Sequence, residues 1–346
     1  MFIKNILVVK ETQEEEARVA LTPKIVSALS SQKYYIWVEK DAGIKAGFSN
    51  LDYINAGAKI FVFSKSFPPN ALIIRVKRPN KIREILENKM FRKEAAMIGF
   101  LDPLDPNTPI NSWQSTEITV FSVDLFKNIS TDDPRNMQAA MSRIAGRLAF
   151  QDGLKRCKNN QKIPKLTVIG TGPAALSAIH EAIKARVPAQ IFGRREKYRK
   201  IFESTGAKYY VIPKHSNQVK FIQNHLKDET IIITAARTPG EKAPLLINTE
   251  SIGILQKGAI VIDLSVNEGG SVEGSKSDQV VISNGVTIVH QSGYPKLEPK
   301  EASEIYAKCM FNLLTEIISP EGEIFFEHEL LKESCLMRSG NLIFQA

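Results

Sequence analysis

The stretch Thr167-Val168-Ile169-Gly170-Thr171-Gly172-Pro173-Ala174-Ala175 decides the fold, because an apolar strand breaks there into a glycine turn that opens a helix-like segment. This order is typical of the phosphate-binding start of a dinucleotide-binding fold. Gly170 permits the tight turn, and Gly172 lets the backbone approach a pyrophosphate, which the amides and positive dipole of a helix N-terminus stabilise. The residues predicted to bind the cofactor here are Gly170, Gly172, Pro173, Ala174 and Ala175, the last of which stands at the third glycine position.

A second apolar strand follows at 189–192, about 20 residues past the first glycine, where such folds place the residue that reads the ribose. The sequence there is Gly193-Arg194-Arg195 and carries no acid. A carboxylate would bind the 2′-hydroxyl of NAD and repel a 2′-phosphate, whereas an arginine pair without the acid would suit the phosphate of NADP. The alternative interpretation is that Arg194 and Arg195 only form a solvated turn.

Length and composition are typical of a soluble globular protein with two domains: the chain has 346 residues, of which 43% are hydrophobic and 24% charged. No apolar run approaches the roughly 20 residues that span a bilayer. The first ten residues have no signal-peptide pattern. We therefore expect a cytoplasmic location and no direct membrane insertion.

The three cysteines and five histidines show neither paired nor metal-ligand spacing, so we expect no metal site. The formal net charge is +9, but lysines and arginines are spread along the chain and are mixed with glutamates between 75 and 92. No aromatic or groove-reading motif accompanies them, so nucleic-acid binding is not expected. Attraction to nucleotide phosphates or to an acidic partner is favoured.

Apolar strands alternate with helical stretches in both halves of the chain, which predicts an α/β protein with two Rossmann-like domains and parallel sheets. The expected strands are 5–9, 34–39, 71–76, 95–100 and 118–123, then 166–169, 189–192, 209–212, 230–235, 259–264 and 287–289. We predict an N-terminal, substrate-side domain formed by 1–135 with 319–346. The dinucleotide-binding domain, with its linking helices, is predicted over 136–318.

Ordered motifs along the chain carry a more specific resemblance. The run Lys10-Glu11, then Arg18-Val19-Ala20-Leu21-Thr22-Pro23, then Gly43 and Gly47-Phe48, resembles the alanine dehydrogenase and pyridine nucleotide transhydrogenase family. Further motifs follow in the family's order: Val76-Lys77-Arg78-Pro79, Thr234-Ala235, Pro239-Gly240, Ala243-Pro244, Asp263-Leu264 and Gly269-Gly270.

The C-terminal region resembles the soluble NAD(H)-binding portion of the transhydrogenase alpha subunit. The motifs are Asn284-Gly285-Val286, Tyr306, Asn312-Leu313-Leu314 and Gly322-Glu323-Ile324. The resemblance implies two Rossmann-like domains with a nucleotide in the cleft between them, and a homodimer. It also implies that hydride passes to NADP on another subunit, while a membrane-embedded partner couples the transfer to proton movement. The chain would then be peripheral at the cytoplasmic membrane through its partners.

Alanine dehydrogenases hold the keto acid with an arginine and a lysine, which the resemblance places at Arg18 and Lys77. Their acid/base histidine corresponds to Asp102, and a later aspartate corresponds to Asn267. An ordinary aspartate is a poor proton acceptor near neutral pH unless its pKa is raised, which disfavours alanine oxidation. Arg18 and Lys77 could equally be surface cations.

The transhydrogenase branch has its own losses in this chain. Its nicotinamide-contacting loop carries Arg, Gln, Asp and Ser at positions that correspond to Asn128, Asp133, Asn136 and Ala139. The segment 208–229 is too short for the mobile, tyrosine-bearing loop of that branch.

Residues at the ends of later strands complete the predicted nucleotide site, because nucleotides bind outside the carboxyl ends of strands in open α/β sheets. They are Thr234, Ala235, Asp263, Leu264, Glu268 and Gly269. The alternative is an ordinary strand-to-loop turn that uses its glycines for positive φ.

Three hypotheses follow. The first is a transhydrogenase alpha-subunit component that binds NAD(H) and needs a partner subunit holding NADP. The second is a stand-alone NAD(P)-dependent amino or imino acid oxidoreductase, in which Arg18 and Lys77 grip a carboxylate and Asp102 is the acid/base. The third is a catalytically reduced nucleotide-binding protein. NAD(H) is the expected cofactor, with NADP(H) as the alternative.

Overall fold

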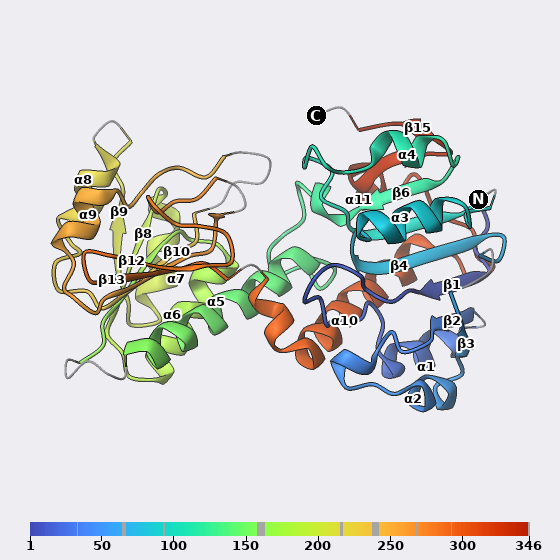
Figure 1. Cartoon of the computed structure of the whole chain (residues 1–346), viewed down its shortest axis with the longest axis horizontal. Helices are drawn as coiled ribbons and strands as arrows, with labels where there is room; N and C mark the ends of the chain where they lie inside the picture. Colours follow the sequence, from blue (N-terminus) through green and yellow to red (C-terminus); the bar gives the residue numbers. More distant parts are fainter. Residues whose placement is uncertain are drawn as a thin grey trace. The chain divides into compact units, whose positions relative to one another are not determined.

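The computed structural model describes residues 1–32, 34–63, 67–92, 94–157, 163–214, 217–236, 242–266, 269–291 and 293–344. The chain divides into two compact units (Figure 1). Unit 1 is Met1–Met141 with Lys296–Ala346, and unit 2 is Ser142–Pro295. Each unit is built around one sheet of mostly parallel strands that alternate with helices, so the predicted α/β fold class is confirmed.

Unit 1 has an eight-stranded sheet in the order β15-β14-β6-β5-β4-β1-β2-β3. Its parallel strands are buried, which explains their nearly continuous apolar sequences. Chain order reverses between β1 and β4, so this sheet has a topological switch point there. The strands are β1 (Asn5–Val8), β2 (Tyr35–Glu39), β3 (Lys59–Phe61), β4 (Ala71–Lys77), β5 (Ala96–Phe100), β6 (Thr119–Ser122), β14 (Cys335–Arg338) and β15 (Asn341–Leu342).

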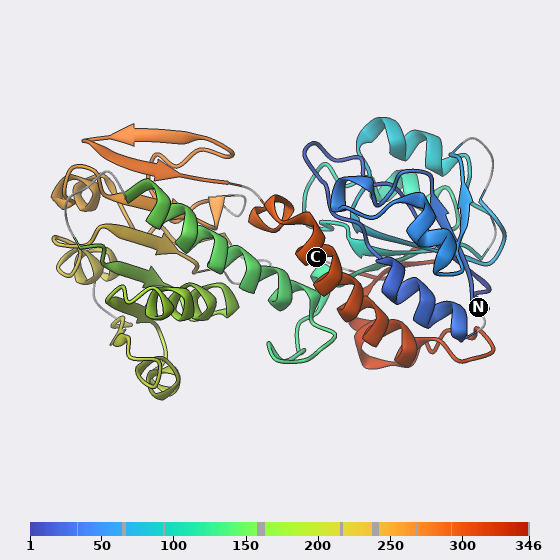
Figure 2. The same cartoon turned by 90° about the horizontal axis from the view of Figure 1, so that it is seen from below.

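Helices cover both faces of this sheet, with α1 and α10 packed together on one side and α3 on the other (Figure 2). Side chains begin two of the helices: Ser49 and Asp52 form a capping box at α2, and Asn80 accepts from the amide of Arg83 at α3. The helices are α1 (Pro23–Ser31), α2 (Asn50–Asn55), α3 (Lys81–Asn88), α4 (Ile110–Gln114), α10 (Pro299–Ile317) and α11 (Glu329–Ser334). Short 3₁₀ turns are η1 (Ile44–Ala46) and η2 (Val123–Leu125).

Helix α3 buries its charged side chains and exposes its apolar ones. Arg83 forms a two-bond ion pair with Glu39, at 2.8 and 2.5 Å, and its Nε donates to Glu87 at 2.7 Å. Glu87 also accepts from the buried Arg75 at 2.6 Å. The exposed aliphatic side chains are Ile82 at 74%, Ile85 at 49% and Leu86 at 44%. A closed ion network therefore ties α3 to β2 and β4.

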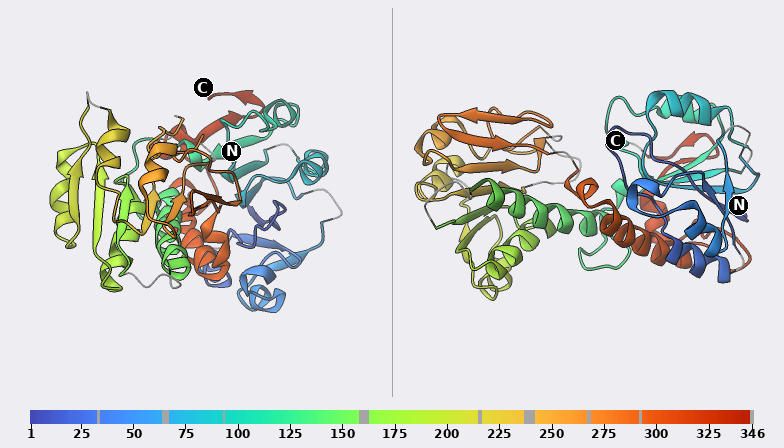
Figure 3. Two further views of the ribbon diagram at one scale, coloured as in Figure 1. Left: turned by 60° about the vertical axis from the view of Figure 1, so that its left-hand side comes forward. Right: turned by 60° about the horizontal axis from the view of Figure 1, so that its bottom comes forward.

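Unit 2 has a seven-stranded sheet in the order β12-β13-β11-β10-β7-β8-β9, with its switch point between β7 and β10. Only β12 runs antiparallel, as the outer arm of a hairpin with β13 (Figure 3). The strands are β7 (Leu166–Ile169), β8 (Ala189–Gly193), β9 (Lys208–Val211), β10 (Ile231–Thr234), β11 (Ile260–Asp263), β12 (Val280–Ser283) and β13 (Val286–Val289). The helices are α6 (Pro173–Lys184), α7 (Arg199–Glu203), α8 (Gln218–Gln223) and α9 (Thr249–Ile254), with the turns η3 (Glu196–Tyr198) and η5 (Tyr294–Leu297).

Helix α5 (Met137–Cys157) begins in unit 1 and continues in unit 2. Within unit 2 it lies against the start of α6, because a Cβ at Gly146 would overlap the backbone of Ala174. Glycine at 146 thus permits the closest approach of the two helices.

The predicted domain limits, 1–135 with 319–346 and 136–318, stay predictions, and the compact units differ from them at α10. This helix belongs to unit 1, where the Tyr306 hydroxyl donates to the carbonyl of Arg75 at 2.8 Å. Ser303 Oγ accepts from the amide of Val19 at 2.9 Å. Among the described residues, no helix is both long and apolar enough to cross a bilayer.

Candidate functional site

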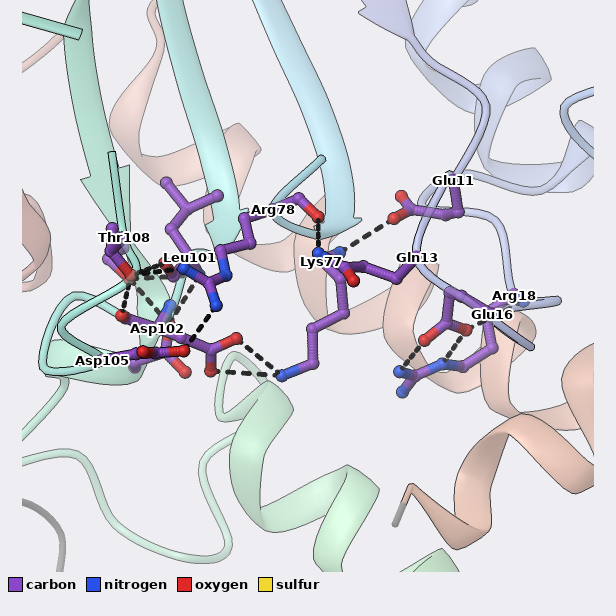
Figure 4. A network of polar contacts seen from close by, with 12 residues as sticks. Glu11, Gln13, Glu16, Arg18, Lys77, Arg78, Leu101, Asp102, Asp105 and Thr108 are labelled. Atoms are coloured by element: carbon purple, nitrogen blue, oxygen red, sulfur yellow. Dashed lines mark hydrogen bonds and ion pairs between the residues drawn. The ribbon is translucent and has the colours of Figure 1, made fainter. Parts of the chain in front are cut away.

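The switch point of the unit 1 sheet gathers side chains from three segments (Figure 4). Residues after β1 supply Glu11, Glu16 and Arg18, the end of β4 supplies Lys77, and the turn after β5 supplies Asp102. The carboxyl ends of parallel strands meet at one edge of a sheet, and ligands bind there in open α/β folds.

Lys77 and Asp102 form an accessible ion pair. The Nζ atom of Lys77 lies 3.2 Å from Oδ1 and 3.3 Å from Oδ2 of Asp102, and the two side chains are 33% and 37% exposed. Asp102 has a left-handed backbone with φ of 50°. The Asp124 carboxylate holds this conformation by accepting from the amides of Leu101 at 2.7 Å and Asp102 at 3.0 Å.

A second set of bonds fixes the turn that carries Asp102. Thr108 Oγ1 donates to the carbonyl of Asp102 at 2.5 Å and accepts from Arg78 Nη1 at 2.9 Å. Arg78 Nη2 donates to Asp105 at 2.5 Å. Both partners of the Lys77–Asp102 pair are thus held by residues next to them in the chain.

Arg18 is buried, and a carboxylate of its own chain fills its guanidinium fork. Its Nε donates to Glu16 Oε1 at 2.7 Å and its Nη2 to Glu16 Oε2 at 2.6 Å, while Nη1 lies 3.4 Å from the sulfur of Met141. Burial raises the pKa of Glu16, but bonds from Arg18 outweigh this and hold it below its usual range. Arg18 therefore already binds a carboxylate in the way expected for a substrate.

Glu11 is a buried acid that we did not select from the sequence. Its carboxylate accepts from the amide of Val76 at 2.6 Å and from that of Lys77 at 3.0 Å. Burial raises the pKa of Glu11 to about 7, against the opposing charge of Arg75. A glutamate directly after an apolar strand that ends at a switch point is a signal that could have identified it.

The glycine turn of unit 2 has the geometry of a phosphate site. Gly170 has φ of 130°, and a Cβ there would overlap the carbonyl oxygen of Ala235 after β10. Gly172 is the N-cap of α6, and a Cβ there would meet no heavy atom within 4 Å. Pro173 occupies the first helical turn, where its missing N–H costs nothing. An open, amide-lined helix N-terminus fits a pyrophosphate.

Three further predicted residues differ in their surroundings. Ala175 is buried in α6, consistent with a third-glycine position that serves close packing. Arg194 and Arg195 are exposed after β8.

The Asp263 carboxylate is occupied within its own unit. Its Oδ1 accepts from Thr234 Oγ1 at 2.9 Å and from the Ser265 amide at 3.0 Å and hydroxyl at 2.7 Å. Its Oδ2 accepts from the amides of Ser271 at 2.9 Å and Val272 at 3.1 Å. These bonds fold the loop after β11, where Gly269 has φ of 103°. Leu264 donates its amide to the Thr234 carbonyl at 3.0 Å.

Glu268 and Asn267, and the expected Pro239-Gly240 motif, lie outside the described residues. Among the residues that are described, no three His, Cys, Asp or Glu side chains are arranged to hold a metal ion. The three cysteines are buried free thiols.

The positions that correspond to the nicotinamide-contacting loop are bound to their own chain. Asn128 Nδ2 donates to Glu333 at 2.6 Å, and Asp133 accepts two bonds from Arg135, at 2.9 and 2.6 Å. Asn136 Oδ1 accepts from the amide of Ala139 at 2.9 Å, as an N-cap of α5 would. This segment therefore begins α5 and orders the loop before it.

Family profiles match nearly the whole chain. The profile described as "Alanine dehydrogenase/PNT, N-terminal domain" matches residues 7–145, and that described as "Alanine dehydrogenase/PNT, C-terminal domain" matches 158–345. The expected family resemblance is confirmed.

Relatives in two branches of the family match end to end. The first of the separate alpha-subunit chains of the NAD(P) transhydrogenase of Rickettsia prowazekii is 26% identical, over 98% of this chain and 96% of its own length. Its counterpart from Rhodospirillum rubrum is 25% identical, over 99% and 98%. Alanine dehydrogenase 1 of Staphylococcus aureus is 26% identical, over 98% and 93%.

Two solved structures share the fold over 98% of this chain. A transhydrogenase from Sinorhizobium meliloti superposes with a TM-score of 0.86 at 25% identity, over 98% of its own chain. An L-alanine dehydrogenase gives a TM-score of 0.83 at 22% identity, over 96% of its own chain.

Proposed function

Because this chain belongs to the alanine dehydrogenase/PNT family, we propose that it binds NAD(H) and exchanges hydride with NADP held by a partner subunit. The observation that carries the proposal is the open N-terminus of α6, with Gly170 and Gly172 before it at the switch point of unit 2. End-to-end similarity to the first alpha-subunit chain of two NAD(P) transhydrogenases supports this assignment.

The residues of the turn fit a dinucleotide. The amides at the start of α6 would hold the pyrophosphate, and the open space at Gly172 would let it approach the backbone. The nicotinamide supplies the hydride chemistry when it is bound. The chain's own residues bind and orient the nucleotide, so hydride transfer itself needs no acid or base from unit 1.

A second candidate function is supported by the Lys77–Asp102 pair. An accessible lysine 3.2 Å from an accessible aspartate could bind a carboxylate substrate and move a proton. Such a chain would be a stand-alone NAD(P)-dependent amino or imino acid oxidoreductase. The pairing of Arg18 with Glu16 weakens this proposal, because the second carboxylate-binding group is occupied.

A third function, nucleotide binding without turnover, is supported by the own-chain bonds of Asn128, Asp133 and Asn136. For each alternative the proposed cofactor is NAD(H), with NADP(H) as the second choice. For the first function we also propose a cytoplasmic homodimer that meets NADP-binding and membrane-embedded subunits.

A mixing experiment separates these functions. The purified chain is incubated with NADH and an NADP analogue, first alone and then with an NADP-binding transhydrogenase subunit, and reduction of the analogue is followed by absorbance. The first proposal expects reduction only in the mixture. Turnover of NADH with pyruvate and ammonia by the chain alone, abolished by Lys77→Ala while nucleotide binding persists, would favour the oxidoreductase. Binding without turnover in both assays would favour the third function.

A further inference from the structure

The end of strand β8 has no room for the acid that dinucleotide folds place there. A Cβ at Gly193 would lie 2.8 Å from Cζ of Tyr209 and would overlap the hydroxyl oxygen of Tyr209 and the methyl group of Thr171. Thr171 is the middle residue of the glycine turn, so a side chain at 193 would point toward the predicted phosphate site. This is the direction from which an acid reads the ribose.

Tyr209 is fixed in this place by bonds on several sides. Its hydroxyl donates to the carbonyl of Arg195 at 2.8 Å. Its ring stacks on Phe202 at a centroid distance of 5.8 Å, and the Arg199 guanidinium lies 5.4 Å from the ring centre. Arg199 Nη1 also donates to the Tyr209 carbonyl at 2.9 Å. A side chain held in this way cannot swing aside at low cost to admit an acid at 193.

The same tyrosine anchors the turn that carries the two exposed arginines. Because the Tyr209 hydroxyl binds the backbone of Arg195, it sets the path of residues 194–196 directly after β8. One side chain thus excludes a negative charge from the ribose position and holds a cationic turn beside it. Both effects favour a ribose that carries a 2′-phosphate.

We propose that Tyr209 is a specificity-determining residue, which keeps the acid out of position 193 and positions the Arg194–Arg195 turn, so that the site accepts 2′-phosphorylated dinucleotides as well as NAD(H). This inference rests on the proposed nucleotide binding. The wild-type chain should then bind NADPH and NADH with affinities within about tenfold of each other, because no carboxylate repels the phosphate.

A double-mutant cycle tests the exclusion without any nucleotide. The variants are Gly193→Asp, Tyr209→Leu and the combination, and the readout is thermal unfolding. We expect Gly193→Asp to lower the Tm of the chain that has Tyr209, and to lower it much less in the Tyr209→Leu background. An equal drop in both backgrounds, or no drop in either, would overturn the exclusion.

Nucleotide titrations test the specificity. Gly193→Asp with Tyr209→Leu should prefer NADH over NADPH at least about tenfold more than the wild type does, because the new carboxylate repels the phosphate. Tyr209→Phe keeps the ring but releases Arg195, and should weaken NADPH about three- to tenfold, the value of one neutral hydrogen bond, with little change for NADH.

Tyr210→Phe is the matched control. Tyr210 is the next residue on β9, and its ring stacks on Phe192 rather than reaching Gly193. The control should bind both nucleotides as the wild type does. Unchanged NADH to NADPH ratios in both Tyr209 variants would overturn the assignment. Failure of the wild type to bind either nucleotide would instead refute the proposed function, while the unfolding data would still decide the exclusion.

Discussion

The Nζ atom of Lys77 lies 3.2 Å from Oδ1 of Asp102, and the pair joins the ends of the neighbouring parallel strands β4 and β5. Both side chains are about one-third exposed, whereas Arg18 and Glu16 form a buried pair in the same region. Two ion pairs at one sheet edge therefore have different physical roles. One is available to a ligand, and the other holds the loop after β1.

This difference predicts opposite effects on stability. Lys77→Met should change the free energy of unfolding by less than about 1 kcal/mol, because exposed pairs contribute little. Arg18→Met should cost about 3–5 kcal/mol, because it leaves the Glu16 carboxylate buried without its partner. Urea denaturation of the two variants measures both values. Similar losses for the two would show that the pairs do not differ in this way.

Glu11 should give the chain a stability that falls as pH rises toward neutrality. Its folded pKa of about 7 is above the ordinary value of 4.5, so the folded state binds the proton more tightly. The contribution is complete below pH 4.5 and is lost as pH rises through 7. Unfolding of the wild type and of Glu11→Gln is compared from about pH 4 to 8, and the difference between them should shrink or change sign over this window. A constant difference would contradict the raised pKa.

The ion network beneath α3 should be sensitive to the loss of one member. Glu87→Ala removes the partner of both Arg75 and Arg83, and should cost about 3–5 kcal/mol because two buried cations lose bonds. Ile82→Ser, on the exposed face of the same helix, should stay within about 0.5 kcal/mol of the wild type. Chemical denaturation checks the contrast. A larger loss for Ile82→Ser would mean that the apolar face is covered in the folded protein.

The two turn glycines should differ in what they contribute to folding. Gly170→Ala should destabilise unit 2 by about 1–3 kcal/mol, because φ is 130° and the Cβ would overlap Ala235. Gly172→Ala should stay within about 0.5 kcal/mol, because the space is open and the backbone is extended. Thermal unfolding of both variants is the measurement. Equal losses would contradict the open geometry at Gly172.

The exposed arginines after β8 give a prediction for cofactor choice. Arg194→Ala with Arg195→Ala should weaken NADPH selectively, because these side chains are the cations nearest in sequence to the ribose position. Fluorescence titration with NADPH and with NADH measures the change. Equal weakening for the two nucleotides, or none, would return both arginines to the role of a solvated turn.

Much of the fold could be predicted because buried parallel strands have continuous apolar sequences. Helix α1 begins and ends at the predicted residues, Pro23 and Ser31, where proline and the loss of apolar spacing mark the limits. The strands β3, β12, β14 and β15 were not predicted. They are short or lie at sheet edges, where half-exposed residues such as those of β12 lack that pattern.

The candidate site was harder to predict, because spacing does not show what a side chain binds. Sequence placed Lys77 and Asp102 in one site only by resemblance, and their ion pair depends on strands β4 and β5 being neighbours. Asp263 and Arg18 were chosen as ligand-binding groups, yet each makes its bonds to neighbours in its own chain. Tyr209 could not be selected, since its contact with position 193 depends on the pairing of β8 with β9.

The most direct test of the central claim is calorimetric titration of the wild type and of Gly172→Val with NADH. The account predicts that the wild type binds NADH and that Gly172→Val, folded to the same Tm, binds it at least about tenfold more weakly, because the added side chain fills the approach to the α6 N-terminus. No NADH binding by the wild type, or equal affinity for the variant, would contradict it.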